Sequence, residues 1–164
     1  ALNNHPEVVY KIYDEWVHSE NENLRRCVSE SCRPFSSIKW IRNPEKNDRI
    51  FNYLTHLRGD SSIYVRKSVG NNLKDLTKYM PIKILDLVTA WIDELKITIS
   101  HDLASKNKQD IGEYEWNVIW TIKQGLRWLK ERNPDYHPKI RSILGSNYIL
   151  YYDEKKNRRA LSDI

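Results

Sequence analysis

The chain has 164 residues, of which 40% are hydrophobic and 30% charged. This length and composition predict one folded domain with a hydrophobic core and argue against a disordered chain. Lysine and arginine number 27 against 22 aspartate and glutamate, and the formal net charge of +5 is compatible with a polyanion partner without requiring one.

Several classes of protein leave no signature in this sequence. A Gly-rich phosphate loop and a Gly-x-Ser-x-Gly elbow are both absent, which argues against nucleotide-dependent enzymes and hydrolases of that type. Cys27 and Cys32 lack Cys-x-x-Cys spacing and the five histidines are scattered, so we expect two free thiols and no metal. No apolar run reaches about 18 residues and no signal sequence opens the chain, so we expect no membrane contact.

Apolar residues recur at the spacing of one helix face in five segments, in chain order residues 9–16, 50–57, 65–76, 84–95 and 119–129. No segment alternates with period two for long enough to predict a strand. Prolines fall near the expected helix ends, at positions 6, 44, 81 and 134. The pattern predicts an all-α protein of six or seven helices in antiparallel pairs.

Three expected second helices of a pair open with an apolar residue followed by at least one base: Leu24-Arg25-Arg26, Val65-Arg66-Lys67 and Ile122-Lys123-Gln124. The first two openings are 41 residues apart, which suits HEAT-like repeats of about 40–47 residues. The third lies 57 residues further on, and a polar insertion at residues 100–110, expected to be a loop, accounts for the extra length. We expect a HEAT-like solenoid over residues 1–150 and a polar, basic tail over residues 151–164.

Stacked repeats would bring the bases of these openings onto one face. Five side chains could then track the phosphates of a nucleic acid: Arg25, Arg26, Arg66, Lys67 and Lys123. The alternative is a set of solvated charges with local partners, such as Arg26 with Glu30 four residues later. Both interpretations fit the sequence.

Polar residues interrupt two of the expected helices. Asn71 and Asn72 are poor helix formers, and Asn71 shares a stripe with Ser68 and Asp75 away from the apolar face. Glu30 follows Arg26 on one face, and Trp40 comes soon afterwards in a loop. These residues suggest a ligand site, because local rules tend to be broken where a protein functions. The alternatives are a polar face packed on a neighbouring helix, an Asp75–Lys78 pair, and a tryptophan that plugs the core.

Three segments carry a resemblance to a known family. They are Leu24-Arg25-Arg26-Cys27-Val28-Ser29-Glu30-Ser31-Cys32-Arg33-Pro34, Tyr64-Val65-Arg66-Lys67-Ser68-Val69-Gly70-Asn71-Asn72-Leu73-Lys74-Asp75-Leu76, and Trp120-Thr121-Ile122-Lys123-Gln124-Gly125-Leu126-Arg127-Trp128-Leu129-Lys130 with the Asn133-Pro134 that follows. Their order and spacing resemble those of the bacterial alkylbase DNA glycosylases with HEAT-like repeats, AlkC and AlkD, and especially the AlkC branch. The similarity covers residues 6–144, and the middle segment is its most specific part.

The resemblance implies a monomeric, cytoplasmic bacterial protein that associates with the nucleoid when it binds duplex DNA. It implies excision of cationic N3- or N7-alkylated bases without a metal or a cofactor. Glu30 and Asp75 would be the catalytic carboxylates and Trp40 the aromatic contact to the cationic base or sugar. The expected DNA-binding side chains are Arg25, Arg26, Arg33, Arg66, Lys67, Ser68, Asn71, Lys123 and Arg127.

The sequence also departs from the family pattern. The loop from Pro34 to Trp40 is longer than the family's, and Gln124 stands where a histidine is common. A further catalytic glutamate of the AlkC branch belongs to a motif that would precede Ala1. Two other functions therefore stay open: a DNA-binding relative without catalysis, and a helical scaffold that binds protein.

Overall fold

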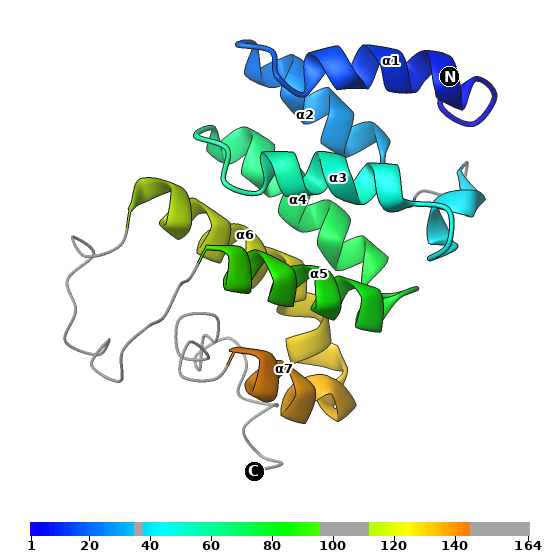
Figure 1. Ribbon diagram of the computed structural model, residues 1–164. Helices are drawn as coiled ribbons and strands as arrows, with labels where there is room; N and C mark the ends of the chain where they lie inside the picture. Colours follow the sequence, from blue (N-terminus) through cyan, green and yellow to red (C-terminus); the bar gives the residue numbers. More distant parts are fainter. Residues whose placement is uncertain (35–37, 96–111, 145–164) are drawn as a thin grey trace.

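The computed structural model describes residues 1–34, 38–95 and 112–144, and all regular structure in these ranges is helical (Figure 1). Seven α-helices and two short 3₁₀ helices follow one another in these ranges: α1 (Pro6–Trp16), α2 (Glu22–Ser31), η1 (Lys39–Arg42), α3 (Asp48–Leu57), α4 (Ile63–Leu76), α5 (Pro81–Glu94), α6 (Glu113–Arg132), η3 (Pro134–Tyr136) and α7 (His137–Leu144). The prediction of an all-α protein is confirmed. None of the described helices has the length and apolarity needed to cross a bilayer.

The helices form two layers, as Figure 1 shows: α1, α3 and α5 lie side by side in one, and α2, α4 and α6 in the other. In the first layer the rings of Tyr13 and Tyr53 meet edge to face at 6.0 Å, and Trp91 Nε1 donates a hydrogen bond to Thr55 Oγ1 at 2.9 Å. In the second layer α4 packs against α2 on one side and α6 on the other. This stacking of helix pairs is consistent with a helical-repeat solenoid.

Helix starts follow local sequence signals. Pro6 and Pro81 occupy the first positions of α1 and α5, where a missing N–H costs nothing. The side chain of Asn21 caps α2 by accepting a hydrogen bond from the Asn23 N–H at 2.9 Å, and that of Ser62 caps α4 by accepting one from the Tyr64 N–H at 3.2 Å.

The core consists largely of the apolar stripes that the sequence predicts. The four stripe residues of α4 are fully buried: Val65, Val69, Leu73 and Leu76. Ile84, Leu85 and Val88 of α5 are fully buried as well. The stripe of α1 differs by one position, because Ile12 is 39% exposed whereas Tyr10 is buried against Tyr53 of α3. The helix is turned so that its tyrosines, rather than Ile12, face the neighbouring helix α3.

Two glycines let α4 and α6 approach closely. A Cβ added at Gly70 would lie 2.7 Å from Gln124 Cβ, and one added at Gly125 would lie 2.9 Å from Leu73 Cβ. The two helices therefore interlock, each offering a glycine to a side chain of the other, and this contact fixes α6 beside the polar stripe of α4.

The third repeat departs from the sequence prediction. Ile122 was expected near the start of a helix, but α6 begins at Glu113 and runs for 20 residues, so Ile122 lies in its middle. The segments expected to be a loop and a tail, residues 100–110 and 151–164, lie outside the described residues.

Candidate functional site

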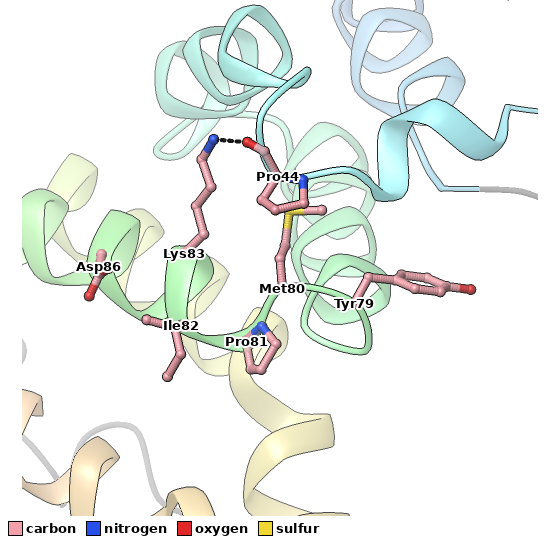
Figure 2. Close-up of a pocket in the computed structure, with 7 residues that line it drawn as sticks. All are labelled: Pro44, Tyr79, Met80, Pro81, Ile82, Lys83 and Asp86. Carbon is pink, nitrogen blue, oxygen red and sulfur yellow. Dashed lines mark hydrogen bonds between the residues drawn. The ribbon is translucent and has the colours of Figure 1, made fainter.

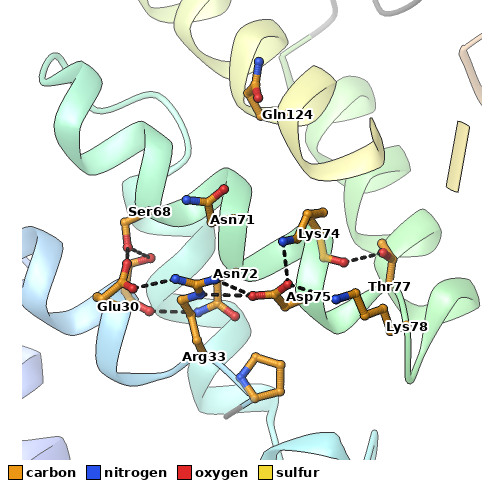
Figure 3. Close-up of polar contacts among 12 residues, drawn as sticks. Glu30, Arg33, Ser68, Asn71, Asn72, Lys74, Asp75, Thr77, Lys78 and Gln124 are labelled. Atoms are coloured by element: carbon orange, nitrogen blue, oxygen red, sulfur yellow. Dashed lines mark hydrogen bonds and ion pairs between the residues drawn. The ribbon is translucent and has the colours of Figure 1, made fainter. Parts of the chain in front are cut away.

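The candidate site is a charged cluster where the end of α2 meets the second half of α4 (Figure 3). Arg33, just beyond the end of α2, bridges two carboxylates that are 45 positions apart in the sequence. Its Nη1 donates to Glu30 Oε1 at 2.6 Å, and its Nη2 and Nε donate to Asp75 Oδ2 at 2.6 and 3.1 Å. One guanidinium thus joins the two carboxylates that the sequence singled out.

The other oxygen of each carboxylate also has a donor. Ser68 Oγ donates to Glu30 Oε2 at 2.8 Å, and Arg26 Nη2 approaches the same oxygen at 3.8 Å. Asp75 Oδ1 pairs with Lys74 Nζ at 2.7 Å and with Lys78 Nζ at 3.5 Å. The local pairs weighed as alternatives, Arg26–Glu30 and Lys78–Asp75, are therefore present beside the contacts between the helices.

These contacts keep both carboxylates ionised. Burial by itself raises the pKa of Glu30, but hydrogen bonds from Arg33 and Ser68 outweigh it, so the pKa lies below its ordinary value. Burial likewise raises the pKa of Asp75, and hydrogen bonds from Lys74 and Arg33 bring it below its ordinary value. At neutral pH the site presents two anionic groups among several cations.

Polar contacts along α4 hold the neighbouring helices in register. Asn72 Nδ2, fully buried, donates to the Ser29 carbonyl of α2 at 2.8 Å. Toward α6, Asn71 Oδ1 accepts a hydrogen bond from Arg127 Nη2 at 2.7 Å, and the same guanidinium contacts the Gln124 side chain at 3.0 Å. The polar stripe of α4 therefore joins all three helices of its layer.

A shallow hollow of about 380 Å³ lies elsewhere, at the turn between α4 and α5 (Figure 2). It is lined by Pro44, Tyr79, Met80, Pro81, Ile82, Lys83 and Asp86. Two of these residues are joined by a hydrogen bond, which Lys83 Nζ donates to the Pro44 carbonyl. Asp86 is the only carboxylate among these lining residues, so the hollow lacks the paired carboxylates of the Arg33 cluster. In the described part of the chain, no group of three His, Cys, Asp or Glu residues is arranged to hold a metal ion.

Comparison with known proteins identifies the family of the chain. The family model described as "DNA alkylation repair enzyme" matches residues 2–107, which span α1 to α5 and include the whole cluster. The chain belongs to this family. A relative from Bacillus subtilis (strain 168), named "Uncharacterized protein YhaZ", is 36% identical over 80 residues, which cover 46% of this chain and 22% of the relative. The chain thus spans about a fifth of that relative's length, and no solved structure matches it.

In this family member, some of the expected DNA-binding residues are held by acceptors within the protein, and others are more accessible. Arg25 and Arg66 turn toward the connection between α3 and α4. Arg25 Nε and Nη2 donate to the Asp60 carboxylate at 2.6 and 3.0 Å, and Arg66 Nη1 donates to the Ser61 carbonyl at 2.8 Å. Both guanidiniums already have acceptors within the protein, and a phosphate would have to compete with them.

Arg26, Lys67 and Lys123 lie more openly on the same layer, whereas Arg33 pairs with Glu30 and Asp75, and Arg127 contacts Asn71 and Gln124. Lys67 is exposed on α4, and Lys123 is half-buried on α6. Arg26 is half-buried and stacks on the exposed ring of Tyr64, with its guanidinium carbon 4.1 Å from the ring centre. Trp40 lies in η1, where its ring is half-buried and packs against the hydrophobic core.

Sequence reasoning missed Lys74 and the backbone of Ser29 as contributors to the site, and it noted Asn72 only as a poor helix former. Lys74 is adjacent to Asp75 in the sequence, so proximity alone could have suggested its role. The contact of Asn72 with Ser29 had no such signal, because it depends on how α2 packs against α4.

Proposed function

We propose that this chain is part of an alkylbase DNA glycosylase of base excision repair. It would bind duplex DNA along the layer formed by α2, α4 and α6, as HEAT-like repeats, and hydrolyse the N-glycosidic bond of cationic N3- or N7-alkylated bases. The observation that carries the proposal is the pair of ionised carboxylates, Glu30 and Asp75, joined by Arg33 on a layer that also bears Lys67 and Lys123. Membership of the DNA alkylation repair enzyme family supports it.

Hydrolysis of this N-glycosidic bond requires mainly electrostatic stabilisation from the protein. An alkylated base is already a cationic leaving group, and its departure leaves oxocarbenium character on the deoxyribose. Fixed carboxylates at that place stabilise the developing positive charge and can orient the attacking water. We assign this role to Glu30 and Asp75, and we assign to Trp40 the contact with the cationic base or sugar.

A DNA-binding relative without catalysis is the second candidate function. The observation that favours it is the charge compensation of the site: Arg33 and Lys74 already contact Asp75, and Arg33 contacts Glu30. Such a site could serve only to hold α2 and α4 in place. A protein-binding scaffold would differ from both candidates in its lack of affinity for duplex DNA.

Release of methylated bases tests the proposal. Methylated duplex is incubated with the full-length protein, and the freed 3-methyl and 7-methyl bases are separated and measured. Release that is lost in Glu30→Gln/Asp75→Asn supports the assignment. Tight duplex binding without release would refute the glycosylase function and leave the non-catalytic one. Release that persists in the double variant would keep the function and remove these two residues from it.

A further inference from the structure

Arg33 holds a place in the site that neither carboxylate chemistry nor phosphate binding by itself explains. We propose that Arg33 is a positioning residue, which fixes the Glu30 and Asp75 carboxylates relative to each other on the face where alkylated DNA would bind. This inference rests on the proposed function. It adds a role for a residue that sequence analysis assigned only to DNA binding.

The contacts of Arg33 link two helices through their carboxylates. Glu30 belongs to α2 and Asp75 to α4, so nothing in either helix by itself sets the distance between their carboxylates. The Arg33 guanidinium spans them with three hydrogen bonds of 2.6, 2.6 and 3.1 Å. Because the guanidinium is planar and its donors are fixed in direction, this contact sets the orientation of both carboxylates as well as their separation.

The surroundings show why a single cation of this shape is needed. The side chain of Arg33 is 17% exposed, and those of Glu30 and Asp75 are 29% and 15% exposed, so water competes little for these contacts. The other charged groups that face the carboxylates each reach only one of them: Arg26 reaches Glu30, and Lys74 and Lys78 reach Asp75. Among these contacts, Arg33 alone links the two carboxylates.

Charge and geometry can be separated by two substitutions. Arg33→Gln removes both the charge and the bridge. Arg33→Lys keeps the charge, but a lysine ammonium is a compact point donor without the planar fork, so it should not hold both carboxylates in the same orientation. A matched control is Arg49→Gln in α3, which removes an arginine with an equally short contact, 2.6 Å to Asp14, outside the site.

The first measurement needs no DNA. Carboxyl titration of the free, folded protein by NMR should show that the pKa values of Glu30 and Asp75 rise in Arg33→Gln and stay unchanged in Arg49→Gln. Circular dichroism and thermal unfolding identify the temperature range in which every variant is folded. Unchanged pKa values in folded Arg33→Gln would overturn the inference, whether or not the protein releases bases.

The second measurement uses base release by the full-length protein. In Arg33→Gln we expect kcat to fall by about tenfold or more, since small misplacements of reacting groups are costly. The acid limb of its pH profile should shift to higher pH, because the pKa values of the carboxylates rise. Arg33→Lys should bind duplex nearly as well as the wild type but should not restore kcat. Full kcat in Arg33→Lys, or an unshifted acid limb in Arg33→Gln, would overturn the positioning role. Absence of release from the wild type would count against the proposed function, and the carboxyl titration would then decide the role of Arg33.

Discussion

Glu30, Arg33 and Asp75 bring two anions and one cation into a half-buried cluster whose members come from two helices. The neighbouring residues Ser68 and Lys74 complete it by donating to the outer oxygen of each carboxylate. Both carboxylates therefore stay ionised at neutral pH and keep a fixed direction, which is what electrostatic stabilisation of a cation requires.

The first prediction concerns catalysis. Asp75→Asn removes one charge with little change in volume, so base release by the full-length protein should slow by about 100-fold or more, as is common when one preorganised electrostatic group is lost. Duplex affinity should hold or rise slightly, because a negative charge near phosphates disappears. Asp93→Asn, on an exposed position of α5, serves as the control and should release bases at the wild-type rate. A wild-type rate in Asp75→Asn would remove Asp75 from the reaction.

The second concerns stability and pH. The folded pKa values of Glu30 and Asp75 lie below their ordinary values of 4.5 and 3.8, so the unfolded chain binds more protons than the folded chain as the pH falls. The stabilisation from the cluster should thus be complete above those ordinary values and disappear as the pH falls through the lowered ones. In urea unfolding, the wild type should be more stable than Glu30→Gln/Asp75→Asn at neutral pH, and the difference should shrink in acid. An equal difference at every pH would contradict the ion-pair assignment.

At the scale of elements, α4 is the centre of the structure. It contacts α2 through Ser68 and Asn72, and it contacts α6 through Gly70, Asn71 and Leu73. The site therefore depends on the packing of α4 as much as on its own residues, since a shift of this helix would move Asp75 away from Glu30.

The glycines at the contact between α4 and α6 test this dependence. Alanine normally favours a helix over glycine, but at Gly70 and Gly125 the added methyl group would meet Cβ atoms that cannot swing away. Overpacking should dominate, so Gly70→Ala and Gly125→Ala should each lower the free energy of unfolding by about 1–3 kcal/mol. The control is Gly112→Ala at the exposed start of α6, where the methyl group meets only the flexible carboxylate of Glu115; it should change stability by about 0.5 kcal/mol or less. Stabilisation by either interface substitution would show that the helices can separate at no cost.

At the scale of the whole molecule, one layer of helices carries both the carboxylate cluster and the expected DNA-binding bases. The net charge of +5 is modest, so duplex affinity would depend on where the cations lie rather than on their total number. Arg25 and Arg66 are occupied within the protein, which leaves Arg26, Lys67 and Lys123 as the more accessible candidates.

Salt dependence tests this arrangement. If the layer contacts about four phosphates, log affinity for duplex should fall with log salt concentration with a slope of about −3 to −4. Lys67→Gln should reduce the magnitude of that slope by about one, because one phosphate contact is lost. Lys11→Gln, an exposed lysine of α1 in the other layer, should leave the slope unchanged. An affinity that hardly responds to salt would exclude binding led by phosphates, and equal effects of the two substitutions would show that the bound face is a different one.

The sequence by itself determined the all-α class, the apolar face of most helices and the polar stripes that carry Glu30 and Asp75. These features are local, because the 3.6-residue period and the helix caps act within a few turns of chain. Only the tertiary structure decided which polar groups meet. Arg25 and Arg26 are adjacent and look alike in the sequence, yet Arg25 turns to Asp60 whereas Arg26 turns to Tyr64 and Glu30. Consecutive helical residues point about 100° apart, and the packing of α2 on α4 selects which direction leads into the protein and which leads toward the site.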